Sequence, residues 1–399
     1  MIYLSFFIVI LVIIIIILID LLPLLKTWIG RIHIGRYTNF NEWSNSVSKV
    51  GYRWLNNTPK IKVTDNNRLI FIDMIRKRYT NRNIQYWQEA ALLLGLIESL
   101  KKKNDPKVKK EIQRFLKRKF DATGQWIEKP QHIDAAILAY AIMKIEFINS
   151  NNYNKAFDYT WELIKAHIGE DGTVGYRKSM MNYRYVDTIG FICPFLITYG
   201  IRYKKEHCVA LSLKQIQEYE RYGLLEYNLP SHAYDLKTKL PLGLIGWGRG
   251  LGWYAIGLMD SFLELPNDSL EKQVLKESVL KYAAAIVKVQ KKNGSWAWTV
   301  TRKESISDSS TTATLGWFLA NVSEILSLSE HYAIAVDTAI KYLMNVTRKD
   351  GTVDFSQGDT KDIGVYSMDF GPLPFTQGFC KRLIDINKKD LKVNQKPTG

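Results

Sequence analysis

Cysteine and the motifs of several common enzyme classes are scarce or missing in this chain. The three cysteines, Cys193, Cys208 and Cys380, form no CxxC pair and no zinc-like spacing, and an odd number does not predict a disulfide framework. HExxH, GxxxxGKS/T, strand-associated GxGxxG, GxSxG and DDxxD-type motifs are absent. These absences argue against metalloenzymes, nucleotide-binding enzymes and terpene cyclases, so we predict a protein without a metal or a cofactor.

Negative charge is in deficit, which predicts an anionic partner. Lys and Arg number 55 against 39 Asp and Glu, a net charge of +16. Nucleic acid, an acidic lipid surface and an acidic substrate all satisfy this charge. The candidate pocket residues described below favour an anionic oligosaccharide or polysaccharide, and we predict no nucleic-acid partner.

The N-terminus is a long apolar run without charge. Residues 1–19 (MIYLSFFIVILVIIIIILI) are long enough, as a helix, to cross most of a bilayer. A cleaved signal peptide is the alternative, but no basic residue precedes the run and no small-x-small site follows it. We therefore predict a transmembrane anchor over residues 1–25 and a juxtamembrane linker over 26–40. Lys26, Arg31 and Arg36 follow the span, so the positive-inside rule favours a cytoplasmic domain on a single-pass protein of a bacterial inner membrane.

The remaining sequence shows helical periodicity and few strand-like alternations, so it predicts one all-α domain over residues 41–387. A polar, lysine-containing tail over 388–399 is expected to be disordered. The predicted helices are 41–57, 66–79, 83–103, 106–119, 132–148, 153–168, 186–204, 207–222, 250–264, 268–291, 310–327, 331–346 and 374–387.

A loose internal repeat organises these helices. Glycine-marked turns recur at the spacing of one helical hairpin plus a long loop, at Gly124, Gly172, Gly223, Gly294 and Gly351. Helices 106–119 and 268–291 carry dense charge, as outer helices do, whereas 132–148, 186–204, 250–264 and 310–327 are apolar nearly all round, as inner helices are. Six such hairpins predict an (α/α)6 barrel, with the long loops gathered at one mouth.

The stretch Gly246–Trp253 has the composition of a carbohydrate or uronate pocket. Its four glycines allow a close backbone approach, Trp247 and Trp253 offer stacking surfaces, and Arg249 provides a fixed cation. The alternative is a glycine-rich turn that caps a helix and buries two core tryptophans.

Two acidic residues stand at the starts of predicted inner helices. Asp187 lies among apolar and aromatic neighbours, where desolvation favours the protonated form and so a proton donor. Asp134 is similarly placed one hairpin earlier. The alternative role for each is a helix N-cap.

His232 lies on the same long loop as Arg249 and is a further candidate contact, although a lone histidine is more often structural. The aromatic residues that could line a sugar-sized cleft, some of them core residues instead, are Trp87, Trp126, Tyr176, Tyr185, Trp247, Trp253 and Trp296.

Five ordered motifs connect these residues to a known family. They are Tyr185–Gly190 with Cys193–Leu196, Ser231–Asp235, Trp247–Gly250 with Gly252-Trp253, Asp308–Ala313, and Gly371–Pro374 with Gln377-Gly378. In these motifs the chain resembles the unsaturated glucuronyl and rhamnogalacturonyl hydrolases, glycoside hydrolase families 88 and 105. The resemblance implies an (α/α)6 barrel and hydration of the C4=C5 double bond of a terminal unsaturated uronate.

The resemblance also implies residue roles. Asp187 looks like the general acid and base, and Asp134 like the second active-site acid. The residues that look like substrate contacts are His232, Arg249, Tyr185, Trp247 and Trp253, with Trp87 beside them.

One departure from the family pattern concerns substrate choice. The family's usual Arg-Gly-Asn-Gly-Trp has Leu251 in place of the asparagine, which puts the usual substrate in question. The leading hypothesis is therefore a membrane-anchored glycoside hydrolase-like enzyme. The alternatives are a non-catalytic or divergent carbohydrate-binding protein of exopolysaccharide biosynthesis, or a helical scaffold for a protein partner.

Overall fold

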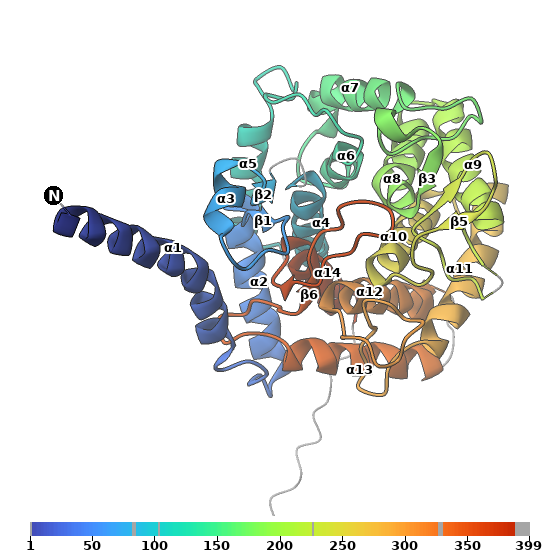
Figure 1. Cartoon of the computed structure of the whole chain (residues 1–399). Coiled ribbons are helices and arrows are strands. Elements are labelled where there is room, and N and C mark those ends of the chain that lie inside the picture. Colours follow the sequence, from blue (N-terminus) through green and yellow to red (C-terminus); the bar gives the residue numbers. More distant parts are fainter. Residues whose placement is uncertain (1, 82–84, 103, 226, 326–329, 388–399) are drawn as a thin grey trace, which may run out of the picture.

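The computed structural model describes residues 2–81, 85–102, 104–225, 227–325 and 330–387 (Figure 1). Its α-helices are α1 (Ile2–Arg31), α2 (Phe40–Asn56), α3 (Ile70–Ile75), α4 (Gln85–Lys102), α5 (Pro106–Lys119), α6 (Ala135–Met143), α7 (Asn154–Lys165), α8 (Val186–Arg202), α9 (Glu206–Tyr222), α10 (Gly248–Glu264), α11 (Leu270–Lys288), α12 (Ser309–Ile325), α13 (Glu330–Asn345) and α14 (Pro374–Ile386). The tail 388–399, predicted to be disordered, lies outside the described residues, as do predicted helical positions 83, 84, 103, 326 and 327.

Short antiparallel strands occur within the loops between the helices. β1 (Ile61–Lys62) pairs with β2 (Thr80–Asn81), and β6 (Ser356–Gln357) pairs with β7 (Phe370–Gly371). A third sheet has the order β3 (Tyr183–Tyr185), β4 (Ala233–Asp235) and β5 (Pro241–Leu242).

The helices form two concentric rings. Each inner helix packs on the next in the order α4, α6, α8, α10, α12 and α14, and α14 closes the ring on α4. The outer helices α5, α7, α9, α11 and α13 each pack on the inner helix that is their neighbour in sequence, while α2 packs on α4 and α14. Figure 1 shows this ring of hairpins from the face that carries the loops. The predicted (α/α)6 barrel is confirmed.

The composition of each helix explains whether it lies in the inner or the outer ring. All nine residues of α6 are buried, because its sequence, AAILAYAIM, is apolar on every face. The basic helix α5 instead buries one stripe only, Val108, Ile112, Phe115 and Leu116. Its start is the predicted one, since the Asp105 side chain accepts a hydrogen bond from the Lys107 N–H ahead of Pro106. Ring closure needs a small residue, because a Cβ at Gly378 would clash with the α4 backbone at Ala91.

Four of the five predicted glycine turns have the same conformation. The φ angles are +75° at Gly124, +71° at Gly172, +85° at Gly294 and +89° at Gly351. In each turn an aspartate or asparagine side chain accepts a hydrogen bond from the N–H two residues later, at Asp121, Asp171, Asn293 and Asp350. Gly223 differs, because it ends α9 with φ −103°. The repeat in the sequence is thus a repeat of turn geometry.

The largest departure from the predicted helices is α3. The sequence predicts a helix over 66–79, but the structure has only Ile70–Ile75. Leu69 and Lys77, at φ 52° and 55°, adopt the left-handed conformation, which interrupts an α-helix on both sides. α3 packs on α1 and lies outside both rings. Helix α6 is also shorter than predicted and ends at Met143.

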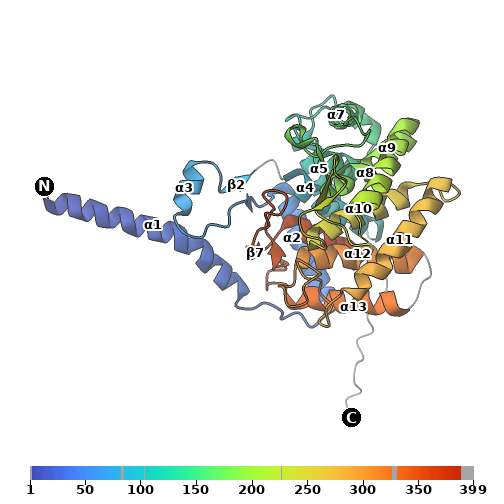
Figure 2. The same ribbon diagram turned by 45° about the vertical axis from the view of Figure 1, so that its right-hand side comes forward.

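Helix α1 extends away from the barrel (Figure 2). Among the described residues it is the one helix long and apolar enough to cross a membrane, and a signal sequence has the same properties. It continues beyond residue 25, the predicted end of the anchor, to Arg31, whose guanidinium lies 2.8 Å from the Asp354 carboxylate of the barrel.

Candidate active site

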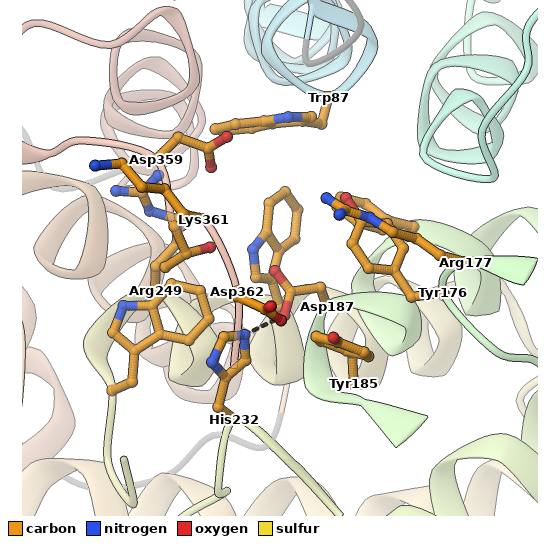
Figure 3. Close-up of a pocket in the computed structure, with 14 residues that line it drawn as sticks. Trp87, Tyr176, Arg177, Tyr185, Asp187, His232, Arg249, Asp359, Lys361 and Asp362 are labelled. Carbon is orange, nitrogen blue, oxygen red and sulfur yellow. Dashed lines mark ion pairs between the residues drawn. The ribbon is translucent and has the colours of Figure 1, made fainter. Parts of the chain in front are cut away.

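A pocket opens at the mouth of the barrel, where the long loops meet the N-terminal ends of the inner helices (Figure 3). It contains seven of the eight site residues predicted from the sequence. The residues that line it are Trp87, Tyr176, Arg177, Tyr185, Asp187, Phe191, His232, Trp247, Arg249, Trp253, Asp359, Thr360, Lys361 and Asp362.

The small sheet β3–β4–β5 brings Asp187 and His232 together. Tyr185 pairs with Ala233 across the two strands, and the Val186 N–H donates to the His232 carbonyl at 3.0 Å. Asp187 then begins the first turn of α8. Its Oδ2 lies 3.8 Å from His232 Nε2, drawn as a dashed line in Figure 3. That distance is too long for a hydrogen bond, and it leaves both atoms free to contact a ligand oxygen or a water molecule between them.

Asp187 is suited to hold a proton at neutral pH. The residue is 8% exposed, the N-cap of α8 is Tyr185 two residues earlier, and Asp187 Oδ2 has no partner within the described part of the chain. Burial raises the pKa of the carboxyl to about 7, with a further increase from Asp359, while Arg249 and Arg177 oppose the shift. The N-cap role that the sequence left open for Asp187 is not what its geometry shows.

His232 faces Asp187 as a neutral ring. Burial lowers the pKa of the imidazole to about 4. Its Nδ1 lies 3.1 Å from the Tyr366 hydroxyl, whose oxygen already accepts the Leu244 N–H at 2.8 Å. The Tyr366 hydroxyl is therefore free to donate to Nδ1, which leaves the imidazole proton on Nε2, the nitrogen that faces Asp187.

Arg249 is a buried cation with unused donors. The residue is 2% exposed, and Nη2 donates to the carbonyls of Gln357 and, at 2.8 Å, Gly358. Nε and Nη1 have no hydrogen-bond partner in the described residues. These two donors point to different sides of the guanidinium, so each can donate a separate hydrogen bond to an anionic ligand.

Gln357 links the arginine to the rest of the mouth. Its side-chain oxygen accepts the Trp247 indole N–H at 2.9 Å, and its backbone N–H donates to Asp308 Oδ1 at 2.9 Å. Asp308 is fully buried and also accepts hydrogen bonds from the Ser310 and Thr311 N–H groups at the start of α12. The Asp308 motif therefore has a structural function, which is to hold the strand that contacts Arg249.

The aromatic residues divide into two groups. Trp87 and Trp253 meet edge to face at the pocket, with ring centroids 5.5 Å apart, and Trp247 and Tyr185 each pack on the ring of His232. Trp126 and Trp296, also candidates from the sequence, are core residues. Trp296 is fully buried and donates its indole N–H to Ile286 O at 2.7 Å, and Trp126 packs on the ring of Phe120.

Asp134 lies near the pocket but is not among the residues that line it. It occupies the N-cap position of α6 without a capping hydrogen bond, and it is 3% exposed with Oδ1 unpaired. Burial raises the pKa of its carboxyl well above the ordinary value, and Asp359 adds to the shift. Asp134 therefore interacts electrostatically with the pocket residue Asp359 although it does not line the pocket.

Leu251, the departure from the family pattern, does not line the pocket. Its side chain is fully buried in the hydrophobic core. The pocket residues that the sequence analysis missed as site residues are mainly on the loop 358–369 (Asp359, Thr360, Lys361 and Asp362), with Arg177 opposite. No motif in the sequence marks these loop residues as part of a site.

The pocket is narrow in this state. Its free volume is about 50 Å³, whereas pockets that enclose a small-molecule ligand typically have ~300–1,000 Å³. Lys361 and Asp362 are exposed, so this side of the pocket faces solvent. Within the described residues, no group of three or more His, Cys, Asp or Glu side chains is placed to hold a metal ion.

Comparison with known sequences identifies the family. Residues 56–370 match the profile of Glycosyl Hydrolase Family 88. The chain belongs to this family. It is accordingly a glycoside hydrolase, as the motifs predicted. No curated protein matches the sequence.

Solved structures share the fold at low sequence identity. A possible member of family 105 from Klebsiella pneumoniae has a TM-score of 0.73 and 15% identity over 88% of this chain and 94% of that chain. A family 105 glycoside hydrolase from C. acetobutylicum has a TM-score of 0.66 and 17% identity over 79% and 97%. The unsaturated glucuronyl hydrolase of Bacillus sp. GL1, described as responsible for degradation of glycosaminoglycan, has a TM-score of 0.64 and 14% identity over 88% and 97%.

Proposed function

We propose that this family 88 enzyme removes a terminal 4,5-unsaturated uronate from an oligosaccharide by hydrating the C4=C5 double bond. The observation that carries the proposal is Asp187, a buried carboxyl with a pKa of about 7 and an unpaired oxygen beside a neutral histidine. A carboxyl with this pKa can donate a proton and accept one back near neutral pH. Unsaturated glucuronyl hydrolases among the structural neighbours support the substrate class.

The proposed reaction adds one water molecule across the double bond. Protonated Asp187 transfers its proton to C4, which leaves positive charge shared by C5 and the ring oxygen. Water attacks C5, and the Asp187 carboxylate takes the proton that the water loses. His232 Nε2–H orients the water from the opposite side of the 3.8 Å gap. The product is a hemiketal, which opens and releases the remaining sugar.

Arg249 is proposed to attract the uronate carboxylate as a buried cation, with Nε or Nη1, its unpaired donors, making the hydrogen bond. Trp247 and Trp253 would contact the sugar ring, with Trp87 and Tyr185 at the edges of the pocket. Asp134 is proposed as the second active-site acid, because its carboxyl is buried close to the charge of Asp359 and its pKa is raised. The substrate is thus an anionic oligosaccharide or polysaccharide end, and its carboxylate replaces solvent at the buried guanidinium.

Helix α1 is proposed as a membrane anchor of a single-pass protein. The exposed apolar surface of residues 2–19 supports this function. The positive-inside rule applied to Lys26, Arg31 and Arg36 favours a cytoplasmic barrel.

The test follows the absorbance of the conjugated double bond. Full-length protein in detergent is incubated with lyase-generated unsaturated oligosaccharides, and Asp187→Asn is compared with wild type. We expect the wild-type absorbance to fall and the variant to be slower by at least ~10²-fold. Normal turnover by Asp187→Asn would exclude Asp187 as the acid. Binding without turnover by wild type across a broad panel would instead indicate the non-catalytic carbohydrate-binding protein.

A further inference from the structure

Helix α3 and the residues beside it form a surface that the barrel does not use. Residues 68–78, here called the α3 patch, lie outside both helical rings and beside α1 (Figure 2). Three large apolar side chains on the patch are exposed, Leu69 at 51%, Met74 at 43% and Ile75 at 75%. Exposed apolar side chains clustered this way mark an interaction site.

The same patch carries a cluster of positive charge. Its basic residues, all exposed, are Arg68, Arg76, Lys77 and Arg78. The one acidic residue of the patch, Asp73, accepts hydrogen bonds from Thr64 and Asn66 instead. Exposed apolar side chains surrounded by lysine and arginine are typical of peptide segments that lie in the headgroup region of an anionic bilayer.

Asp20 fixes the patch at the end of the apolar run of α1. Its Oδ2 accepts the Leu69 N–H at 2.7 Å, and its Oδ1 accepts the Ile70 N–H at 3.0 Å. Asp20 is the first charged side chain after the apolar residues 2–19, which span ~27 Å as a helix at 1.5 Å per residue, close to the hydrocarbon thickness of a bilayer. An α1 that spans the membrane therefore brings the α3 patch to the level of the lipid headgroups.

We propose that the α3 patch docks on the anionic lipid surface beside the α1 anchor, with Leu69, Met74 and Ile75 inserted among the headgroups. This inference rests on the proposed anchoring by α1. The segment 62–65, which precedes the α3 patch, also contacts the loop 358–369 at the active site. Lys62 pairs with Asp369 at 2.8 Å, and Lys361 pairs with Asp65 at 3.1 Å. Docking thus turns the mouth of the barrel toward the membrane, and the substrate end is received close to the lipid surface.

The test measures the depth of single fluorescent labels in full-length protein reconstituted into vesicles. The native cysteines Cys193, Cys208 and Cys380 are all buried. An introduced exposed cysteine is therefore labelled selectively. Labels at Ile75→Cys on the patch, Ile8→Cys on α1 and Leu270→Cys on α11 are exposed to a quencher attached to the lipid acyl chains. Ile75 and Leu270 are similarly exposed in the protein, at 75% and 70%, which makes them a matched pair.

We expect quenching at positions 8 and 75 and none at 270, in vesicles of phosphatidylcholine mixed with phosphatidylglycerol. Quenching at 8 without quenching at 75 would overturn the docking and leave the anchor intact. Loss of quenching at both positions would overturn the anchor as well. Quenching at 270 equal to that at 75 would show that the whole surface contacts lipid, which also contradicts the proposal.

Charge removal separates an anionic lipid partner from general apolar contact. The triple variant Arg76→Gln/Lys77→Gln/Arg78→Gln should lower the ratio of docked to undocked patch about fivefold for each charge removed. Vesicles of pure phosphatidylcholine should produce a similar loss with the wild-type patch. The control variant removes three exposed lysines from the outer helix α11, as Lys276→Gln, Lys281→Gln and Lys288→Gln. This variant should have no effect on docking. Equal effects of the two triple variants would refute the role of the α3 patch.

Discussion

Removing either of two charged neighbours of Asp187 should move the alkaline limb of the pH–rate profile in opposite directions. Arg177 lowers the pKa of the Asp187 carboxyl and Asp359 raises it, although burial is the largest cause of the net increase. Because the proposed first step needs protonated Asp187, activity should be present below the pKa and lost as the pH rises through it. Arg177→Gln should therefore shift the loss to higher pH, and Asp359→Asn should shift it to lower pH.

The size of the effect follows from the environment of Asp187. A pKa of about 7 instead of the ordinary 3.8 corresponds to about 4 kcal/mol in favour of the neutral carboxyl, at 1.36 kcal/mol per pH unit. About half of the enzyme is protonated at pH 7, and about one molecule in a hundred at pH 9. The wild-type kcat/KM should accordingly fall about 50-fold between these pH values, since this parameter reports the free enzyme.

The assay is the loss of double-bond absorbance, with kcat/KM measured from pH 5 upward for each variant. Lys281→Gln on α11 removes a positive charge far from the pocket and should leave the profile unchanged. The pKa of Asp359 is itself raised by burial, so the two carboxyls titrate as a pair and the profile reports apparent values. A flat profile from pH 7 to 9, or shifts of the same sign in both variants, would refute the acid role of Asp187.

Three further changes test the support of the site and the barrel. Arg249→Lys keeps the charge but loses the Nε and Nη1 donors of the buried guanidinium, so KM for a uronate-ended substrate should rise ~10-fold or more with smaller change in kcat; an unchanged KM would place carboxylate binding elsewhere. Asp308→Ala leaves the Gln357 N–H and the α12 N-terminus without their acceptor, and we expect a loss of ~2–4 kcal/mol in the free energy of unfolding by urea. Arg382→Met leaves the buried Asp260 carboxylate without the guanidinium 2.7 Å away and should cost ~3–5 kcal/mol, whereas adding Asp260→Leu should recover part of that loss.

The ring of hairpins was predictable because it depends on regular features. Inner helices such as α6 are apolar on every face, outer helices such as α5 have one apolar stripe, and four turns repeat a left-handed glycine after an Asp or Asn. The exception, α3, is a short helix whose limits are set by Leu69 and Lys77 in the left-handed region. Its N–H groups bond to Asp20, a contact between segments far apart in the sequence that periodicity does not reveal.

The candidate site was predictable where a residue belongs to a local motif. Asp187, His232 and Arg249 stand in such motifs, and the structure brings them to one pocket. Asp359 and Arg177 were missed because loops without periodicity bring them there, and no local signal distinguishes them from other surface charges. Leu251 shows the converse limit: its place in the family motif put the usual substrate in question, yet the helix directs its side chain into the core.

The unpaired groups at the pocket are the strongest argument that it binds a ligand. An unsatisfied buried polar group costs ~1–3 kcal/mol, and more when it is charged. Asp187 Oδ2 and two donors of Arg249 have no partner in the described chain, although the neighbouring Gln357 and Asp308 satisfy theirs. An acid and a cation left open at one pocket match a ligand that carries both a carboxylate and a protonatable centre, as the proposed unsaturated uronate substrate does.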